Sequence, residues 1–309
     1  MTEKRRNNRT ALALGSFDGL HNGHMQVISA VVAKANAGLL PVLVRFDRHP
    51  AEILRGKAPD RLLTDKCRQD ILSRMGVAEE ILPFREICSY SPERFVKEIL
   101  KEQLQAAFVS CGFNYRFGKN GDGTAQMLRQ LCAENGIECS IAEEVTYKEA
   151  AVSATRIRSC LQNGQTEDAN AMLGRPFCYD FEVVGGDRRG RLMGTPTINQ
   201  YFPQGFLVPE HGVYAAYAQV NNELHPAVTN IGIRPTFNGN GERSETWIMD
   251  FSGDLYGQNI PVYLLSYLRK EVKFDNMDAL RDQILSDAQR SRNIFESFQK
   301  KLKKNEKNA

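Results

Sequence analysis

The sequence predicts an α/β protein in which a doubly wound parallel sheet is followed by a smaller antiparallel β-barrel and a terminal helix. Between residues 11 and 145, short apolar runs alternate with longer helical patterns, as expected for parallel strands joined by right-handed crossovers. After residue 174 the pattern changes to short or alternating apolar runs separated by Gly, Asn and Pro, which is typical of an antiparallel barrel. This change predicts two domains, residues 1–174 and 175–309.

The elements follow from the local patterns. In the first domain, strands are expected at 11–17, 39–46 and 106–113, and helices at 25–38, 65–74, 92–103 and 125–135. A helical stretch up to Gly174 precedes the barrel strands, and a last helix is expected over residues 276–303. Ligands of doubly wound sheets bind beyond the carboxyl ends of the strands. The runs "GSFDG" and "CGFNYRFG" occupy two such ends.

Composition excludes several classes of protein. A net charge of +3, with the basic excess concentrated in the two tails, argues against a nucleic-acid or membrane binder. The seven cysteines are odd in number and scattered without a C-x-x-C pair, which indicates reduced thiols in a cytoplasm. No segment approaches the ~20 apolar residues of a membrane span. The protein is expected to be soluble and cytoplasmic, and the sequence leaves its oligomeric state open.

The stretch "ALALGSFDGLHNGH", residues 11–24, joins an apolar strand to a glycine-rich turn and two histidines. Glycines let the backbone approach a phosphate closely, and a helix starting near Asn22 would present its N–H groups to an anion. His21 and His24 lie on that first turn, where imidazoles can donate to phosphate oxygens. A zinc site is disfavoured because no third ligand is nearby, and a purely structural pair stays an alternative. Asp18 fits a capping or packing role.

A second constellation lies in "GDRRGRLMGTPTINQ" and "SETWIMDFSGDLYGQ". Thr197 and Asn199 are two residues apart on an extended segment, so both can face one magnesium ion. The basic, glycine-rich run before them suits a flap over phosphates. Glu245 alternates onto the same face as Trp247 and can act as a general base. The structural alternatives are an Asn-stabilised turn for "PTIN" and an exposed strand position for Glu245.

These strings resemble the bacterial bifunctional riboflavin kinase and FAD synthetase (FMN adenylyltransferase) family. The first domain is similar to its adenylyltransferase half through "GSFDGLHNGH", "RFDRHP", "RLLTD", "GFNYRFGKNGDG" and "VSATRIR". The second resembles its riboflavin kinase half through "GTPTIN", "GVY", "NIGIRPTF" and "ETWIMDFSGDLYG", in the family's order and spacing. The resemblance implies a Rossmann-like nucleotidyltransferase domain, a riboflavin kinase barrel, and an enzyme that makes FMN from riboflavin and FAD from FMN with ATP and Mg²⁺.

For the first domain, the resemblance implies attack of the FMN phosphate on the α-phosphorus of ATP, with pyrophosphate leaving and no protein nucleophile. It places His21 and His24 on the ATP phosphates and Asn114 near the magnesium. The remaining ATP-binding residues that it implies are Gly15, Phe17, Gly23, Thr155 and Arg158.

For the second domain, the resemblance implies that Thr197 and Asn199 bind Mg–ATP and that Glu245 is the base for the ribityl 5′-hydroxyl attacking the γ-phosphorus. Gly190 and Gly194 would shape the nucleotide flap. Arg269 would lie on the flavin side of the pocket or pair with Glu271.

Four positions depart from the family pattern. Ala154 replaces the second serine of S-S-T, which removes one neutral hydrogen bond worth about 0.5–1.5 kcal/mol. Arg45 and Arg48 stand where a small residue and a proline are usual, and Thr195 replaces an aromatic or aliphatic residue. Two other functions therefore stay open: a riboflavin kinase with a weak or specialised nucleotidyltransferase domain, and a protein that binds or senses flavin nucleotides.

Overall fold

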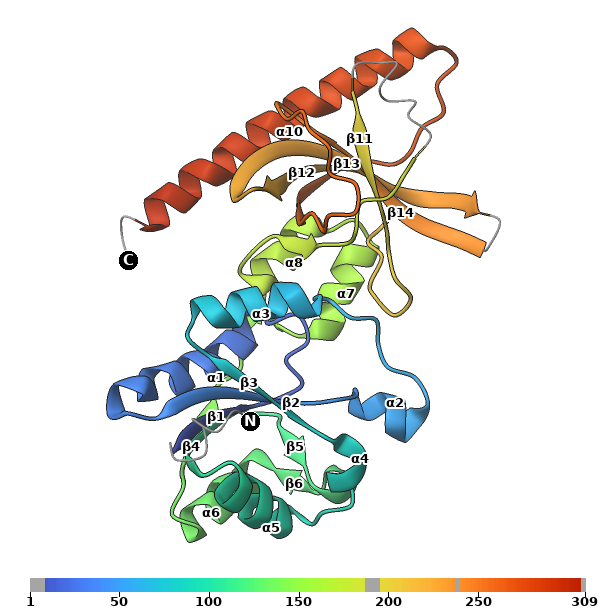
Figure 1. The fold of residues 1–309 in the computed structure, drawn as a ribbon. Coiled ribbons are helices and arrows are strands. Elements are labelled where there is room, and N and C mark those ends of the chain that lie inside the picture. Colours follow the sequence, from blue (N-terminus) through green and yellow to red (C-terminus); the bar gives the residue numbers. More distant parts are fainter. Residues whose placement is uncertain (1–8, 187–194, 237–238, 307–309) are drawn as a thin grey trace. The chain divides into compact units, whose positions relative to one another are not determined.

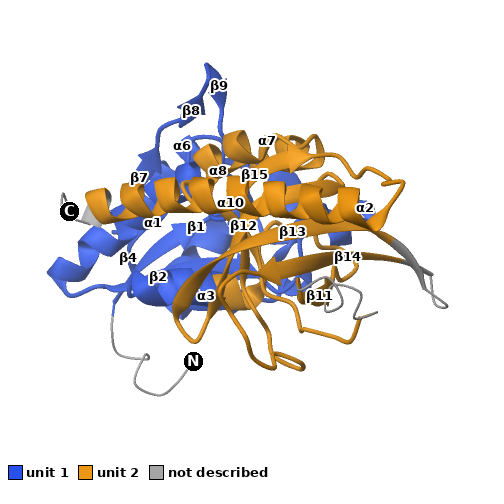
Figure 2. Cartoon of the chain, turned by 90° about the horizontal axis from the view of Figure 1, so that it is seen from above, with its two compact units in different colours: residues 1–60, 68–153 blue, residues 61–67, 154–309 orange. Residues whose placement is uncertain are grey.

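A computed structural model describes residues 9–186, 195–236 and 239–306 of the chain (Figure 1). Its contacts divide the chain into two compact units, shown in two colours in Figure 2. Residues 1–60 and 68–153 form unit 1, and residues 61–67 and 154–309 form unit 2. Among the residues described, no helix is long and apolar enough to cross a membrane.

Unit 1 contains a five-stranded parallel sheet in the order β3-β2-β1-β4-β7 (Figure 1), which confirms the predicted sheet type. Its strands are β1 (Thr10–Leu14), β2 (Leu40–Phe46), β3 (Ala78–Leu82), β4 (Ala106–Gly112) and β7 (Glu138–Ala142). From β1 the chain builds outward to β2 and β3, and then returns to add β4 and β7 on the other side. The order therefore reverses between β1 and β4, which is where doubly wound sheets bind ligands.

Helices connect these strands. They are α1 (Asn22–Val32), a 3₁₀ turn (Ala33–Ala37), α2 (Pro50–Arg55), α3 (Asp65–Arg74), α4 (Phe84–Ile87), α5 (Pro92–Arg94), a π-helical stretch (Phe95–Gln103) and α6 (Ala125–Glu134). Two small hairpins, β5 (Arg116–Phe117) with β6 (Gly123–Thr124) and β8 (Thr146–Tyr147) with β9 (Ala150–Ala151), extend from the connections. Every residue of β1 is buried, as expected for a central strand covered on both faces.

Unit 2 begins with α7 (Ala154–Gln162) and α8 (Thr166–Leu173) and continues into a six-stranded antiparallel sheet, as predicted. In sheet order its strands are β10 (Phe177–Tyr179), β15 (Val262–Arg269), β12 (Gly212–Val220), β13 (Glu223–Thr236), β14 (Gly239–Ile248) and β11 (Thr197–Tyr201). The chain beyond β10 also pairs with the far edge of the sheet, where the amide of Val184 donates to the carbonyl of Asn199 at 2.9 Å. This bridge links the segment after β10 to the other edge strand, β11, so the sheet curves toward a barrel.

The terminal helix α10 (Met277–Glu306) packs across the barrel. Asn276 caps its start by accepting from the amide of Ala279 at 2.8 Å. Midway along, the buried hydroxyl of Ser291 donates to the carbonyl of Ala227 at 2.6 Å and accepts from the amide of Ala216. These bonds fix the helix to β13 and β12, so its first turns have a defined position over the barrel wall.

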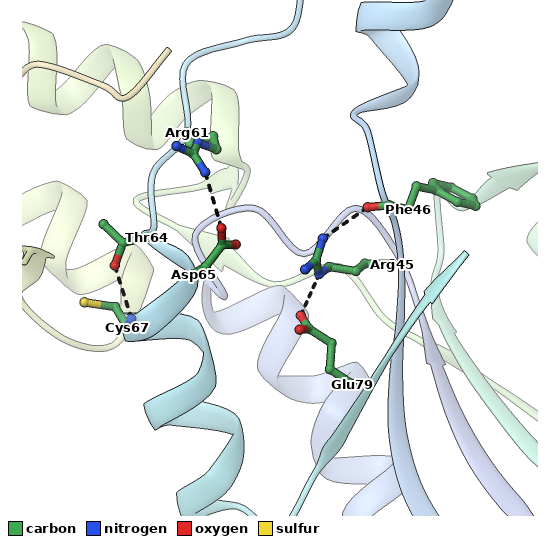
Figure 3. Close-up of polar contacts among 7 residues, drawn as sticks. All are labelled: Arg45, Phe46, Arg61, Thr64, Asp65, Cys67 and Glu79. Atoms are coloured by element: carbon green, nitrogen blue, oxygen red, sulfur yellow. Dashed lines mark hydrogen bonds and ion pairs between the residues drawn. The ribbon is translucent and has the colours of Figure 1, made fainter. Parts of the chain in front are cut away.

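A short segment from the first half of the chain, residues 61–67, belongs to unit 2. The amide of Arg61 donates to the carbonyl of Gly205 at 2.8 Å, and its carbonyl accepts from the amide of Leu207 at 2.9 Å. Thr64 accepts from the amide of Cys67 at 3.1 Å and so caps α3 (Figure 3). The Arg61 guanidinium lies 3.7 Å from Asp65. The "RLLTD" string therefore has a structural use here. The functional boundary after residue 174 stays a prediction.

Candidate active sites

The turn that follows β1 in unit 1 is tightly wound. Phe17, Gly19 and Leu20 all have positive φ, and the side chains of Phe17 and Leu20 are buried. A Cβ added at Gly15 would lie 3.2 Å from the Phe17 ring, so the ring packs directly on the backbone at that position. Non-glycine residues in this region carry backbone strain that the surrounding packing must hold. The turn is thus a preformed structure that delivers the chain to the start of α1.

His21 and His24 are brought together, as the sequence predicts. His21 is the N-cap of α1, and its Nδ1 accepts from the amide of His24 at 3.4 Å. The two rings stack with centroids 3.6 Å apart, and Phe17 meets His24 edge-on at 5.3 Å. Because Nδ1 accepts, a neutral His21 carries its proton on Nε2. A Cβ at Gly23 would lie 3.2 Å from the His21 ring, so this glycine allows the ring its position.

Asn114 reaches the same edge of the sheet as the histidine turn. Leu14 at the end of β1 pairs with Cys111 near the end of β4, so the turns after both strands start side by side. The Asn114 amide oxygen lies over Gly112, and a Cβ there would be 3.5 Å away. Burial raises the pKa of the neighbouring Tyr115, so its phenol stays neutral. The structure thus places the histidine turn and the turn of Asn114 at the ends of the neighbouring strands β1 and β4.

Thr155 and Arg158, the other predicted ATP-binding residues of this half, lie on α7. Thr155 is exposed and Arg158 is half-buried. Helix α7 belongs to unit 2, whereas the histidines and Asn114 belong to unit 1. Ala154 is the first residue of α7 and places a methyl group where the family pattern has a hydroxyl. Participation of Thr155 and Arg158 in one ATP site with the histidines stays a prediction.

The two unusual arginines both have carboxylate partners. Arg45, on β2, donates from Nε to Glu79 of β3 at 2.7 Å and from Nη1 to the carbonyl of Phe46 at 3.3 Å (Figure 3). Arg48 pairs with Glu52 at 3.2 Å on the exposed side of α2. The Arg45 charge is thus already compensated within unit 1, and its side chain is 22% exposed. An ion pair, rather than simple surface exposure, accounts for its presence.

In unit 2, strand register places three of the predicted kinase residues in one row, whereas Thr197 pairs with Trp247 two positions away. Asn199 of β11 pairs with Glu245 of β14, Glu245 pairs with Asn230 of β13, and Asn230 pairs with Val213 of β12. Val213 in turn pairs with Arg269 of β15. Directly paired residues project from the same face of a sheet. We call these five residues the site row: Asn199, Glu245, Asn230, Val213 and Arg269.

Most of the site row lines a cavity of about 310 Å³. Its polar wall includes Glu245, Asn230 and Arg269, and its apolar wall comes from the barrel, the segment after β15 and the first turns of α10. The apolar residues are Val213, Val228, Trp247, Val272, Phe274, Leu280 and Ile284. The buried Thr195 also lines it, so the family's larger residue is replaced inside the cavity. We call this space the acceptor cavity.

A second cavity of about 350 Å³ adjoins the same strand. It is lined by the start of β11 and by the loop after β14, over the residues Val183, Pro196, Thr197, Ile198, Ile248, Phe251, Ser252, Gly253, Asp254, Leu255 and Tyr256. We call it the donor cavity. Thr197 lines both cavities, so one hydroxyl-bearing residue stands where they meet.

Asn199 is held by a residue that sequence reasoning missed. A Cβ added at Gly186 would lie 2.3 Å from Asn199 Nδ2 and 2.9 Å from its Oδ1, so the amide packs directly on the Gly186 backbone. Asn199 is only 6% exposed. The glycine-rich run did predict a flap at this place, but it did not single out this glycine. Gly190 and Gly194, which it did single out, lie outside the described residues.

Gly186→Ala is expected to lower the kcat of phosphoryl transfer in unit 2 by about 10- to 100-fold, because moving a substrate-positioning group by about 1 Å has effects of that size. The added methyl group would displace the Asn199 amide. Steady-state kinetics of the variant check this, with Gly185→Ala as the matched control, since a Cβ at Gly185 meets nothing within 4 Å. Equal kcat values for the two variants would contradict a role for the Gly186–Asn199 contact.

Arg269 lies in the wall of the acceptor cavity, and its partner is Asp287 instead of Glu271. Its Nε donates to Asp287 Oδ2 at 2.9 Å, and Nη2 lies 2.8 Å from the same oxygen. Asp287 is 1% exposed and also accepts from Gln283 at 3.1 Å. Glu271 instead accepts from Asn230 Nδ2 at 2.7 Å. The pairing had no signal in the sequence, because Asp287 lies 18 residues away on α10.

Glu245 has a close cationic neighbour that the sequence analysis also missed. Arg243 lies two residues earlier on β14, and its Nη2 donates to Glu245 Oε1. The Glu245 side chain is 38% exposed, whereas that of Arg243 is 9% exposed. The carboxylate thus reaches the acceptor cavity while the guanidinium stays behind it. Glu245 pairs with Asn199, two residues from Thr197 on β11. A carboxylate in this position, at the wall of a cavity, is suited to accept a proton from a bound hydroxyl.

Comparison with known proteins gives one family model for each part of the chain. A family model described as FAD synthetase matches residues 3–156, and one described as riboflavin kinase matches residues 173–295. Proteins named bifunctional riboflavin kinase/FMN adenylyltransferase match along most of their length. That of Bacillus subtilis is 34% identical over 94% of both chains, and that of Escherichia coli K12 is 31% identical over 92% of both.

A solved structure is also similar. The crystal structure of a protein from Streptococcus pneumoniae, titled a macrolide-efflux protein, superposes with a TM-score of 0.84. It is 30% identical in sequence, and the match covers 93% of this chain and 95% of that one. The likeness extends over both units of the fold described above.

Proposed function

The chain belongs to the family of the bifunctional riboflavin kinases/FMN adenylyltransferases, and on that premise we propose which of its residues carry each of the two reactions. The enzyme phosphorylates riboflavin with ATP to give FMN, and it transfers AMP from ATP to FMN to give FAD and pyrophosphate. The kinase reaction belongs to the barrel of unit 2, and the adenylyl transfer to the switch point of unit 1.

The position of Thr197 between two cavities carries the kinase proposal. Riboflavin occupies the acceptor cavity, whose apolar wall suits the isoalloxazine ring, and ATP occupies the donor cavity. Glu245 accepts the proton of the ribityl 5′-hydroxyl as its oxygen attacks the γ-phosphorus, and ADP leaves on the donor side. Arg269 lies on the flavin side, fixed by Asp287. Most of the rate enhancement then comes from alignment of donor and acceptor.

The residues present also fit a magnesium ion. Thr197 and Asn199 offer a hydroxyl and an amide oxygen, the hard oxygen ligands that Mg²⁺ takes together with substrate phosphates. The packing of Asn199 against Gly186 pre-orients that amide. When bound, Mg²⁺ neutralises charge on the transferring phosphoryl group. Asn199 and Thr197 themselves orient the phosphates toward the Glu245 side of the barrel.

In unit 1, the histidine turn supports binding of the ATP phosphates for adenylyl transfer. A His21 Nε2–H and the His24 ring can donate to phosphate oxygens, and the start of α1 adds its partial positive charge. Asn114 holds the phosphates or their magnesium from the neighbouring strand end. A role of Thr155 and Arg158, on α7 of unit 2, in binding a triphosphate stays a prediction. The histidines and Asn114 stabilise the charge that develops on the α-phosphoryl group, without a protein nucleophile.

Product analysis tests the assignment. The purified chain, given riboflavin, ATP and Mg²⁺, is expected to yield FMN and then FAD with pyrophosphate, and chromatography separates the three flavins. Chelation of Mg²⁺ by EDTA is expected to stop both steps, because each moves a charged phosphoryl group. FMN without FAD or pyrophosphate would select a kinase with a weak first domain. Flavin binding without either product would select a flavin-nucleotide binder or sensor.

A further inference from the structure

We propose that Arg243 is a positioning residue for riboflavin phosphorylation: it holds one oxygen of the Glu245 carboxylate so that the other oxygen faces the acceptor hydroxyl. The inference rests on the proposed role of Glu245. It is carried by the contact between Arg243 Nη2 and Glu245 Oε1 and by the burial of the arginine.

The strand geometry explains why the two side chains meet. Arg243 and Glu245 are two residues apart on β14, so they project from the same face of the sheet. On the neighbouring strands, Arg243 pairs with Gly232 of β13 and Tyr201 of β11. Gly232 has no side chain, and the Glu271 carboxylate packs over it, since a Cβ added there would lie 2.7 Å from Glu271 Oε1. Arg243 makes its contact with Glu245 along its own strand.

The burial of Arg243 separates this role from direct substrate binding. Its side chain is 9% exposed. Arg243 is not among the described residues that line the acceptor cavity or the donor cavity. The guanidinium acts on the reaction only through the carboxylate that it holds. A carboxylate fixed at one oxygen loses rotational freedom, and its second oxygen then has a single direction in which to accept a proton.

The other charged groups of the acceptor cavity already have different partners. Arg269 is bound to Asp287, and Glu271 accepts from Asn230. Arg243 is therefore the cation that contacts Glu245 among the residues that the structure describes. A lysine at this place keeps the charge but loses the planar fork of donors that fixes a carboxylate.

The test compares Arg243→Met and Arg243→Lys in riboflavin phosphorylation. The Met variant is expected to lower kcat by about 10- to 100-fold with less than about 3-fold change in KM for riboflavin and ATP, because orientation and not binding is lost. The Lys variant is expected to recover part of kcat. Arg290→Met, which removes an exposed arginine of α10, is the control and is expected to keep kcat. Thermal melts report that each variant is folded, and FAD formation from supplied FMN reports that unit 1 is intact.

A double variant separates this inference from the proposed function. If Arg243 acts through Glu245, then Arg243→Met is expected to change the residual activity of Glu245→Gln by less than about 2-fold. Additive losses, or an unchanged kcat in Arg243→Met, would overturn the positioning role while leaving Glu245 as the base. Full kinase activity in Glu245→Gln alone would instead overturn the proposed function. If the Met variant is unfolded, the same comparison is made with Arg243→Lys, for which an unchanged kcat would count against the inference.

Discussion

Glu245→Gln is expected to lower the kcat of FMN formation by about 10²- to 10⁴-fold, the usual contribution of a general base. The amide keeps the size of the side chain and its place in the site row, but it cannot take the proton of the ribityl hydroxyl. FAD formation from supplied FMN is expected to continue at the rate of the unmodified enzyme, because that reaction belongs to unit 1. Separate assays of the two steps, with riboflavin in one and FMN in the other, check both halves of the prediction.

Glu242→Gln is the matched control, since the same substitution falls on the same strand but on its other face, beside His211 at 3.6 Å. It is expected to leave both rates nearly unchanged. Equal loss of FMN and FAD formation in Glu245→Gln would contradict separate sites for the two reactions, and retention of FMN formation would remove the catalytic role of Glu245.

His24→Ala is expected to show the opposite pattern. FAD formation should fall by about 10²- to 10³-fold, the effect of removing one preorganised donor from a site where charge develops. The change also removes the ring that stacks on His21 at 3.6 Å, so the position of the N-cap histidine is loosened as well. FMN formation from riboflavin should be unaffected. Pyrophosphate release and flavin chromatography measure the two steps in parallel.

His211→Ala, which removes an imidazole of unit 2 that lies beside Glu242, serves as the control for the loss of a histidine. It is expected to keep full FAD formation. Should His24→Ala also make FAD at the unmodified rate, the histidine pair would have only the structural role that the sequence leaves open as an alternative.

Local sequence signals were sufficient for the histidine site. The strand, the glycine turn and the start of α1 at Asn22 follow one another within 14 residues, so spacing alone places His21 and His24 together. The two edge strands β3 and β7 were missed, because they are short and carry polar residues such as Glu79 and Glu138. An edge strand has a neighbour on one side only and often carries charged residues there, so its pattern of apolar residues is weaker.

The kinase site depends on features that a linear pattern does not contain. Thr197, Asn199 and Glu245 were predicted from the sequence, but the alignment of Asn199 and Glu245 with Asn230 and Arg269 is a consequence of strand register, which is set by turns and packing. The pairs Arg269–Asp287 and Gly186–Asn199 join distant segments. Arg243 was within reach of sequence reasoning, since it alternates onto the face of Glu245. Basic residues are common on strands, however, so alternation alone did not identify Arg243 as a functional residue.

The site row also sets where this protein can tolerate changes in length. One residue inserted in β13 or β14 ahead of its row position would turn every following side chain of that strand to the opposite face and remove its member from the row. The two-residue connection between β12 and β13, Asn221 and Asn222, lies beyond the row and has both residues at positive φ, as in tight hairpin turns. Insertions and deletions among related enzymes should therefore gather at such connections, while the strand segments between them keep a constant length.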